Sequence, residues 1–589
     1  MNIASTAHGK SSKGGWNAAI FIILVEVAQQ FAFYGLASNL IMYLTDVLDQ
    51  PLAAAAKNVT TWLGVSSVFP VLGAFLADSY FGRFKTIVFS VAIYFLGTVL
   101  LTLSVSVIPS QRRRAVFFVA LYILSVAQGG QQPCLQTFAA DQFDENTPEE
   151  IKAKSSFFNW WYLGFVFAAT SATLGVVYLQ DNVGWGLGFG ILAGVLLVSL
   201  VSFLLGTKRY RKQRPPGSPF TTVAQVLVAA ARKWHVTVTL NCENVYYGDE
   251  KGEGQLQGQS QPIVLARTNQ LRCLDKAMII DELDASTEPR NPWRLCSLNQ
   301  VEEVKLVLRL IPLWLSCLMF GVIQVQHNTF FTKQSSTTIL SIGPHFKVPP
   351  ASLQGLSGIA ILITIPIYDR VFVPIARKYT GHPSGITVLQ RIGTGLVLSI
   401  LVMVVSALVE AKRLNIAKDY NLIDKPKAIV PMRVWWLLPQ YLILGLAYAF
   451  ATVGLQELFY HQMPEQMRSM GAAALYCVMG VGSFMSNWII SVVQLITSRN
   501  GDKWLGDNIN RAHLDYFYWV LAVLSTLNFC VYVLIANAFV YKKVKREDKV
   551  ETELSIANNH GGAIGDILIG HDSSAQEEQD SNMDKVIYH

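Results

Sequence analysis

Twelve stretches of predominantly apolar residues alternate with polar segments along the chain. Each stretch is about 18 residues or longer, which is the length that a helix needs to cross the hydrocarbon core of a bilayer. Several exceed that minimum, which indicates tilted helices rather than extra crossings. The pattern predicts transmembrane helices over residues 17–46, 61–80, 86–108, 115–140, 157–178, 184–206, 304–331, 352–377, 387–411, 434–461, 468–496 and 514–541.

A long polar segment divides the predicted helices into two groups of six, so we expect an all-α integral membrane protein. Two such halves are typical of transporters that close alternately around a cavity at the middle of the membrane. Channels, receptors and membrane enzymes also contain many helices. The expected parts are an N-terminal tail (1–16), a six-helix bundle (17–206), a linker (207–303) with a disordered Gly/Gln-rich stretch (252–261), a second six-helix bundle (304–541) and a disordered tail (542–589).

The composition supports a membrane protein and argues against soluble classes. Only 15% of the 589 residues are charged, whereas soluble proteins carry roughly a quarter. The net charge of +7 is small, so we expect no nucleic-acid partner. The seven cysteines have no paired spacing, which predicts neither a disulfide framework nor a metal site. No nucleophile–base pair or phosphate-binding loop stands out, so we expect neither an enzyme nor a bound cofactor.

Lysine and arginine residues beside the predicted helices give an orientation. Basic residues at 208–214 and 542–546 place the linker and both termini in the cytoplasm. The basic residues at 112–114 and in the 412–433 loop fall on the outside in this topology, so the rule is only partly obeyed. The sequon that begins at Asn58 falls in the first predicted outside loop, where it fits glycosylation or a chance match equally.

The turn between the second and third predicted helices reads GAFLADSYFGRFKT. Gly73 and Gly82 allow close approach of helices or backbone, and Asp78 can pair with Arg83 at the cytoplasmic edge, where breaking the contact would permit rocking. This spacing resembles the loop 2–3 motif of the major facilitator superfamily. Thr86 follows Arg83 at a spacing that many kinases accept, and a phosphate there would bias the rocking equilibrium.

Further motifs narrow the resemblance. They are FAADQFD (138–144), FNWWY (158–162), NPWRLC (291–296), VEEVK (301–305), TFFTKQ (329–334), PQY (439–441), ELFY (457–460) and HLDYFYW (513–519). Together they resemble the plant nitrate/peptide transporter family, a branch of the proton-dependent oligopeptide transporters. The resemblance covers residues 15–541 and implies a twelve-helix facilitator fold in a plant plasma or vacuolar membrane. It also implies proton coupling in most members, whose solutes include nitrate, peptides, hormones and defence metabolites.

The chain departs from that family at an ion-pair network. Relatives carry Glu-x-x-Glu-Arg/Lys in the first helix and a lysine before a proline in the fourth. Here Glu26 remains, but Gln29, Gln30 and Gln132 replace the second carboxylate and both cations. An unpaired charge is costly in a low dielectric, and amides cost far less. We expect these four residues to face the substrate, and either Glu26 is the sole remaining proton site or coupling is lost.

Four more positions belong to the predicted substrate site. Tyr448 replaces the family's glutamate eight residues after the glutamine of PQY, so a peptide's amino end loses its partner. His327, beside the family-typical Gln326, could bind an anion, relay protons or form a structural hydrogen bond. Glu457 is equally consistent with a structural and a substrate-facing role. Aromatic side chains that could line a cavity are Phe33, Tyr34, Trp160, Trp161 and Trp488.

These features favour a plant secondary transporter that moves a small organic solute, such as a hormone or specialised metabolite, with atypical or absent proton coupling. A second hypothesis is a nitrate or other small-anion transporter that is proton-coupled through Glu26 or His327. A third is a non-transporting membrane sensor on the same scaffold. The expected partners are the solute, the bilayer and, where coupling persists, protons; the sequence is silent on oligomeric state.

Overall fold

The computed structural model describes residues 14–143, 148–212, 219–235, 246, 267–281, 284, 291–342, 346–380, 385–426, 428–463, 468–499 and 504–541. The two segments predicted to be disordered, 252–261 and 542–589, lie outside these residues. Among the described residues, eleven helical stretches are long and apolar enough to cross a membrane, and a pair of helices bent by 47° makes a twelfth. The prediction of an all-α membrane protein with twelve spans is confirmed.

The N-terminal half contains the first six spans. Its helices are α1 (Trp16–Ala37), α2 (Leu40–Met42), α3 (Leu52–Leu76), α4 (Arg83–Ser106), α5 (Ser110–Ala140), α6 (Pro148–Ser171), α7 (Val177–Asn182) and α8 (Trp185–Leu205). Single π-helical turns extend α2, extend α3 and join α6 to α7, at Tyr43–Val47, Ala77–Phe81 and Ala172–Val176. A short 3₁₀ turn, Gly206–Lys208, follows the last of these helices.

The C-terminal half contains the other six spans. Its elements are α11 (Leu298–Ser316), α12 (Leu318–His327), α13 (Phe330–Ser336), β1 (Ser341–Ile342), β2 (Phe346–Lys347), α14 (Gly355–Ile367), α15 (Val373–Thr380), α16 (Val388–Asp419), α17 (Leu438–Gln462), α18 (Arg468–Arg499) and α19 (Leu514–Ala538). Shorter helical turns are Pro350–Gln354, Tyr368–Phe372 and Val434–Leu437. The two strands form one antiparallel hairpin.

The described part of the linker is a small helical unit beside the bundles. It contains α9 (Pro219–Arg232) and a 3₁₀ helix, Arg272–Met278, which pack against the first turns of α11. A capping box at Ser297 and Gln300 fixes the start of α11, because each side chain satisfies a backbone N–H of the other. An ion pair between Lys233 and Asp284 lies buried inside this unit.

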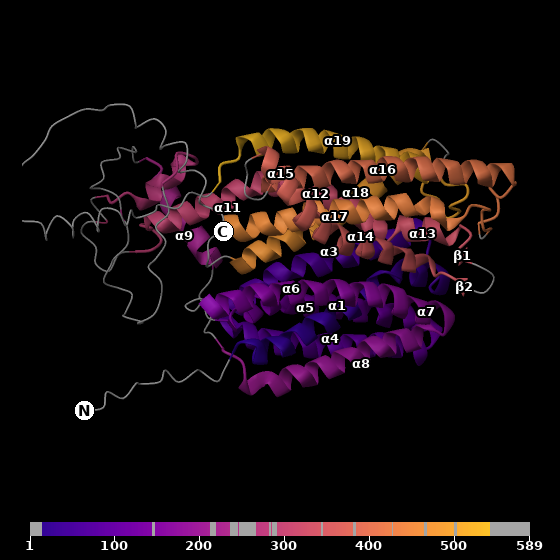
Figure 1. Ribbon diagram of the computed structural model, residues 1–589, viewed down its shortest axis with the longest axis horizontal. Helices are drawn as coiled ribbons and strands as arrows, with labels where there is room; N and C mark the ends of the chain where they lie inside the picture. The colour runs from indigo at the N-terminus through magenta and orange to yellow at the C-terminus, as the bar shows by residue number, and fades with distance from the viewer. Residues whose placement is uncertain are drawn as a thin grey trace, which may run out of the picture.

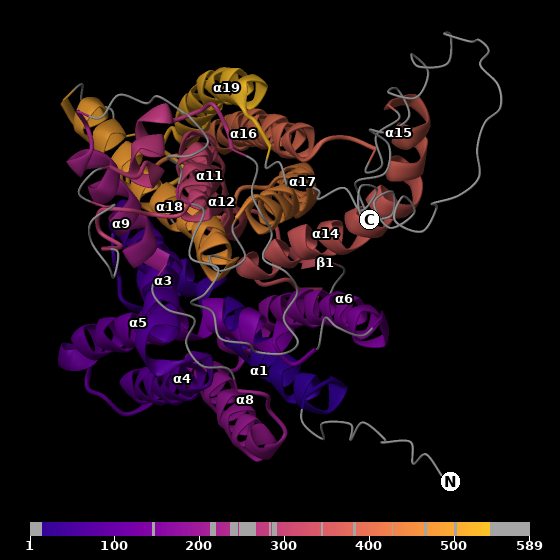
Figure 2. The ribbon, with the colours of Figure 1, turned by 90° about the vertical axis from the view of Figure 1, so that its left-hand side faces the viewer.

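The two halves lie side by side with their helices running in one general direction (Figure 1). The linker lies at one end of the bundle, here called the linker end, and the β1–β2 hairpin lies at the other, here called the hairpin end. A view from the linker end separates the N-terminal half from the C-terminal half, with α3 and α18 at their junction (Figure 2). Packing of α3 and α5 on α18, and of α6 on α14, joins the halves.

Polar contacts join the halves on the hairpin-end side of the bundle. Lys333 of α13 reaches the turn after α2, where its Nζ lies 2.8 Å from Asp46 Oδ1 and 2.9 Å from Thr45 Oγ1. Gln354 Nε2 donates to the carbonyl oxygen of Ser38 over 2.8 Å. Lys57 of α3 also donates to a glutamine of α18. These contacts hold the hairpin end closed in this conformation.

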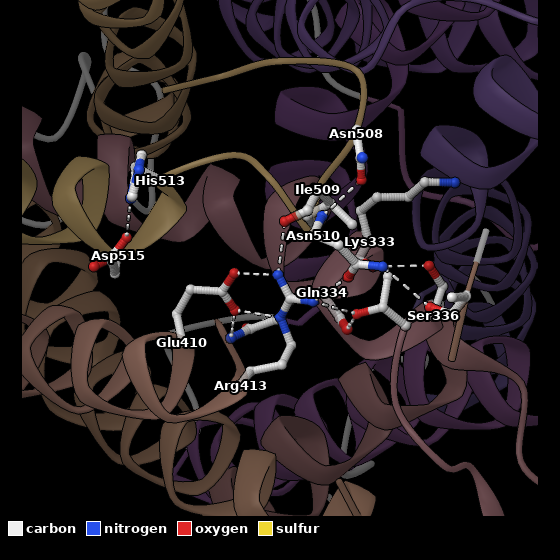
Figure 3. Close-up of polar contacts among 12 residues, drawn as sticks. Lys333, Gln334, Ser336, Glu410, Arg413, Asn508, Ile509, Asn510, His513 and Asp515 are labelled. Carbon is white, nitrogen blue, oxygen red and sulfur yellow. Dashed lines mark hydrogen bonds and ion pairs between the residues drawn. The ribbon is translucent and has the colours of Figure 1, made fainter. Parts of the chain in front are cut away.

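A buried ion pair organises the hairpin end of the C-terminal half (Figure 3). Arg413 and Glu410, one turn apart on α16, are both fully buried, and Arg413 Nη2 lies 2.6 Å from Glu410 Oε1. The guanidinium also bonds Asn510 Oδ1 and the carbonyl oxygen of Ile509, which fixes the loop before α19. Gln334 Nε2 donates to the other carboxylate oxygen over 2.7 Å, so the network includes α13.

The first connection differs from the sequence prediction. The second span was expected to begin at residue 61, but α3 begins at Leu52. The sequon at Asn58 therefore lies inside a helix rather than in a loop, and Asn58 Nδ2 donates to Gln50 Oε1. Polar Lys57 and Asn58 lower the local hydropathy, but the alanines before them favour a helix. A hydropathy pattern marks the apolar core of a span rather than its helical end.

Candidate functional site

A cavity of about 210 Å³ lies between the two halves. Its wall comes from α1, α3, α5 and α6 of the N-terminal half and from α12, α14, α17 and α18 of the C-terminal half. Among the 29 described residues that line it, none is an aspartate, glutamate, lysine or arginine. The polar part of the wall consists of amides, hydroxyls and one imidazole. A solute in this cavity therefore meets hydrogen-bonding groups but no fixed charge.

Three glutamines form the amide wall of the N-terminal half: Gln30 on α1, and Gln128 and Gln132 on α5. Gln128 and Gln132 are one turn apart, and Gln128 Nε2 donates to Gln132 Oε1 over 3.4 Å. Gln132 also lies close to Tyr476 of α18 in the lining of the cavity. That contact joins the halves on the linker-end side of the cavity.

Glu26 lies behind this wall rather than in it. The side chain is 5% exposed and is absent from the lining of the cavity. Gln30 Nε2 donates to Glu26 Oε1 over 2.9 Å, and Tyr476 lies close enough to interact with the carboxyl electrostatically. Glu26 forms no salt bridge with any residue that the structure describes. An amide therefore stands between the one buried carboxyl of α1 and the solute.

The C-terminal half contributes a second polar wall. Gln324, His327 and Asn328 come from the last turn of α12 and its C-cap, beyond the bend of the seventh span. His327 Nε2 lies 3.3 Å from Ser357 Oγ on α14, and its ring lies 5.5 Å from that of Tyr441. The imidazole is therefore held in place by its neighbours and is the only histidine among the lining residues.

Aromatic rings line the cavity between the two polar walls. Phe33 and Tyr34 on α1 meet edge to face, and Tyr34 meets Phe165 of α6 in the same way. Tyr448 of α17 lies beside Tyr34 across the junction of the halves. These rings give the cavity apolar faces that suit a ring-containing solute.

The structure places the predicted substrate residues in two groups. Those that line the cavity are Gln30, Tyr34, Gln132, His327 and Tyr448. Those that do not are Glu26, Gln29, Gln326 and Glu457.

The outlying residues have other surroundings. Gln29 is fully buried without a hydrogen bond to any described residue. Gln326 Nε2 donates to Ser486 Oγ on α18. Glu457 pairs with Arg391 over 3.3 Å. Of the tryptophans considered for an aromatic cavity, Trp160 and Trp488 are exposed on the bundle surface and none lines the cavity.

The lining residues that the sequence analysis missed include Gln128, Gln324 and Tyr476. Gln128 stands one turn before Gln132, so the i, i+4 spacing applied to Glu26 and Gln30 would have found it. Gln324 is likewise within one turn of His327 on α12. Tyr476 gives no such signal, because it reaches the cavity from another helix.

The conformational motif has the expected local contacts. Arg83 bridges Asp78 over 3.2 Å and Asp141 over 2.6 Å, and Gly82 has a left-handed φ of 79°. A Cβ on Gly73 would lie 2.1 Å from the carbonyl oxygen of Gly129, so only glycine permits this approach of α3 to α5. Thr86 is buried and donates to the Gly82 carbonyl oxygen, so a kinase cannot reach it in this conformation.

The two-half bundle and its cavity can be compared with known proteins. The PTR2 profile of the POT family matches residues 84–505, more than half of the chain. The chain belongs to the POT family. The Arabidopsis thaliana protein NRT1/PTR FAMILY 5.4 is 56% identical over 547 residues, covering 92% of this chain and 98% of that protein. NRT1/PTR FAMILY 5.10 of the same plant is 47% identical, covering 91% and 95%.

Solved structures show the same fold. A crystal structure described as an auto-inhibited POT family peptide transporter superposes with a TM-score of 0.66 at 20% identity, covering 89% of this chain and 97% of that one. The POT family transporter PepTSo gives a TM-score of 0.64 at 20% identity, covering 88% and 98%. The predicted membership of the plant nitrate/peptide transporter family, with a facilitator-type fold, is confirmed. Its family and fold are those of membrane transporters.

Proposed function

We propose that this protein is a secondary transporter of a small, uncharged organic solute and that its transport is not driven by the proton gradient. The observation that carries the proposal is the wall of the cavity, where the described lining residues include no carboxylate, ammonium or guanidinium group. A charged solute buried there would lose its hydration without gaining an ion pair, which is strongly unfavourable. A neutral solute gains hydrogen bonds and aromatic contacts instead.

Free peptides fit this cavity poorly. A zwitterionic peptide needs an anion for its amino end and a cation for its carboxylate. Tyr448 lines the cavity beside Tyr34, at the position where a peptide's amino end would need an anion. Gln30 and Gln132 line the positions where a peptide's carboxylate would need a cation. The chemistry of the wall therefore disfavours the substrate class named in the descriptions of the related crystal structures.

Loss of proton coupling follows from the surroundings of Glu26. A coupling carboxyl must change partners when it gains or loses a proton, so that protonation changes the balance between open and closed states. Glu26 has an amide partner, Gln30, and no cation among the described residues. A neutral amide offers no ion pair for a proton to break.

A second candidate function is supported by one observation. His327 lines the cavity, and a protonated imidazole is a natural partner for nitrate or another small anion. The contact with Ser357 and the ring of Tyr441 are compatible with a neutral imidazole as well. Small-anion transport therefore remains the alternative.

We also propose that the linker end faces the cytoplasm of the plant cell, in the plasma or vacuolar membrane. The support is the basic sequence at 208–214 and 542–546. An epitope tag on the N-terminus should react with antibody in cells only after the plasma membrane is permeabilised, and on isolated vacuoles it should react without permeabilisation. Labelling of intact cells would show that the N-terminus faces the outside, which is the opposite orientation.

The proposed function is tested by uptake and efflux screens on the full-length chain in oocytes. Neutral organic solutes, nitrate and dipeptides are compared at equal concentration. We expect concentration-dependent flux of at least one neutral solute and little flux of nitrate or dipeptides. Gln132→Lys should suppress the neutral flux because it places an ammonium in the wall, whereas Gln131→Lys, outside the lining, tests for general damage.

Two outcomes would contradict the proposal. Nitrate flux that exceeds every neutral flux, and that His327→Gln abolishes, would establish the anion alternative. A correctly inserted protein without flux of any tested class, in either direction, would leave a sensing role as the better account.

A further inference from the structure

Two amide atoms at the cavity lack a hydrogen-bond partner among the described residues. They are Oε1 of Gln128, on the N-terminal half, and Nε2 of Gln324, on the C-terminal half. Both atoms are buried, and leaving a buried polar atom unpaired is unfavourable. The unmet groups are complementary, because one accepts and the other donates. A solute that satisfies both connects the two halves of the protein.

The amide orientation of Gln128 is set by its neighbours. Its Nε2 donates to Gln132 Oε1 over 3.4 Å, and Gln132 in turn lies close to Tyr476. The oxygen of Gln128 is therefore the atom left for a ligand. A solute can therefore donate a hydrogen bond to Gln128 Oε1 from a hydroxyl or an N–H group.

The size of the cavity limits the solute. A dry cavity of about 150 Å³ is known to hold one benzene ring. The cavity here measures about 210 Å³, which leaves room for one ring and a short polar substituent at each end. Phe33, Tyr34 and Phe165 supply apolar surfaces for such a ring.

We propose that the cavity is a binding site for a compact, neutral, single-ring solute that donates a hydrogen bond to Gln128 Oε1 and accepts one from Gln324 Nε2. This inference rests on the proposed function and names the substrate class of the same site. An acidic analogue of the same shape is excluded, because no cationic lysine or arginine lines the described wall.

The test uses a matched pair of probes on the purified full-length chain in lipid nanodiscs. 4-Hydroxybenzamide has a hydroxyl donor and a carbonyl acceptor at opposite ends of one ring. 4-Hydroxybenzoate has nearly the same shape but is an anion at pH 7.5. Isothermal titration calorimetry should show that the amide binds at least about tenfold more tightly, because the carboxylate is desolvated without a counter-ion.

Leucine substitutions assign the two contacts. Gln128→Leu and Gln324→Leu should each weaken binding of 4-hydroxybenzamide by about tenfold, the usual effect of losing one buried hydrogen bond. Gln131→Leu is the matched control, since Gln131 is buried on the same helix but does not line the cavity. Benzamide lacks the hydroxyl, so its affinity should be the same in the wild type and in Gln128→Leu.

The inference is overturned if 4-hydroxybenzamide does not bind, if 4-hydroxybenzoate binds equally or better, or if neither leucine variant changes the affinity. These failures differ from failure of the proposed function. If 4-hydroxybenzamide binds but is not transported, the binding site is supported and transport of this class of solute is refuted. If other neutral solutes are transported and 4-hydroxybenzamide does not bind, the proposed function is supported and the binding site is refuted.

Discussion

Single residues show where this protein tolerates buried charge. Arg413 and Glu410 are fully buried. The guanidinium is compensated by the carboxylate of Glu410 and by hydrogen bonds to the loop before α19. The central cavity has the opposite composition, with amides where relatives carry ions. This buried pair holds the loops of the hairpin end, another buried pair lies inside the linker unit, and the described lining of the cavity carries no charged group.

Removing one member of that pair should be strongly destabilising. Arg413→Met leaves Glu410 as a buried carboxylate without its counter-ion, which typically costs about 3–5 kcal/mol. Chemical unfolding of the detergent-solubilised protein should report this loss, and Glu410→Gln added to Arg413→Met should recover part of it.

An exposed ion pair on the same end of the molecule provides the control. Arg511 and Asp424 lie 3.8 Å apart and are both largely exposed. Arg511→Met should change stability by no more than about 1 kcal/mol, as is usual for surface pairs. Equal effects of Arg413→Met and Arg511→Met would refute the structural role of the buried network.

Restoring the two cations of relatives should not restore proton-driven transport. Gln30→Arg with Gln132→Lys places cations beside Glu26, but Gln29 still lacks the second carboxylate of the family pattern. We expect reduced neutral flux without a strong pH response, measured in oocytes at outside pH 5.5 and 7.5. Uptake by the double variant that rises steeply at pH 5.5 would show that two cations suffice.

At the scale of elements, the ion pair between Lys333 and Asp46, here called the Lys333 latch, joins the two halves on the hairpin-end side of the cavity. Lys333 ties α13 to the turn after α2, and its partner Asp46 is half-exposed. Partly exposed ion pairs contribute about 0–1 kcal/mol. Lys333→Met should therefore raise the population of the hairpin-end-open state by up to about fivefold. Spin-label distances between the β1–β2 hairpin and the loop after α2 measure that population.

A charge swap separates the ion pair from other effects of this change. Asp46→Lys combined with Lys333→Asp should return the distance distribution towards the wild type. A distribution that is identical in all three proteins would mean that helix packing and the contacts of Gln354 and Lys57 hold the hairpin end closed without this ion pair.

The linker unit should lose stability in acid. Burial raises the pKa of Asp281, but hydrogen bonds from Arg294 and from the backbone N–H of Asp284 outweigh it and hold that pKa below its usual 3.8. A carboxyl whose pKa is lower in the folded state than in the unfolded state stabilises the fold at pH values above the unfolded-state pKa. That stabilisation is lost as the pH falls through the folded-state pKa. Protection of the Arg272–Met278 helix from hydrogen exchange, taken relative to the intrinsic exchange rate at each pH, should fall below about pH 4; Asp281→Asn should show the lower protection already at pH 7.

The sequence predicted the spans better than it predicted the site. Long apolar runs identify membrane helices directly, but lipid-facing and cavity-facing side chains are both apolar, so Trp160 could not be separated from Phe33. Departures from a family pattern located Gln30, Gln132 and Tyr448. Glu26 shares a helical face with Gln30, yet it lies one turn nearer the linker end and outside the cavity.

At the scale of the whole molecule, two halves enclose a neutral cavity between two sets of polar contacts. The Lys333 latch lies towards the hairpin end, and the contact between Gln132 and Tyr476 lies towards the linker end. Alternate breaking of the two sets would expose the cavity first to one side and then to the other. Under the proposed function this exchange of contacts uses no proton, because the groups that change partners are amides, hydroxyls, the Lys333 pair and the Arg83–Asp78 pair.

A neutral solute that crosses without a proton should leave the pH inside a vesicle unchanged. This is measured with proteoliposomes that contain the full-length chain and an internal pH dye, with a transported neutral solute from the oocyte screen added outside. We expect solute entry down its own gradient, unaffected by a protonophore, with no change of internal pH. Acidification of the lumen in proportion to solute entry, abolished in Glu26→Gln, would contradict it.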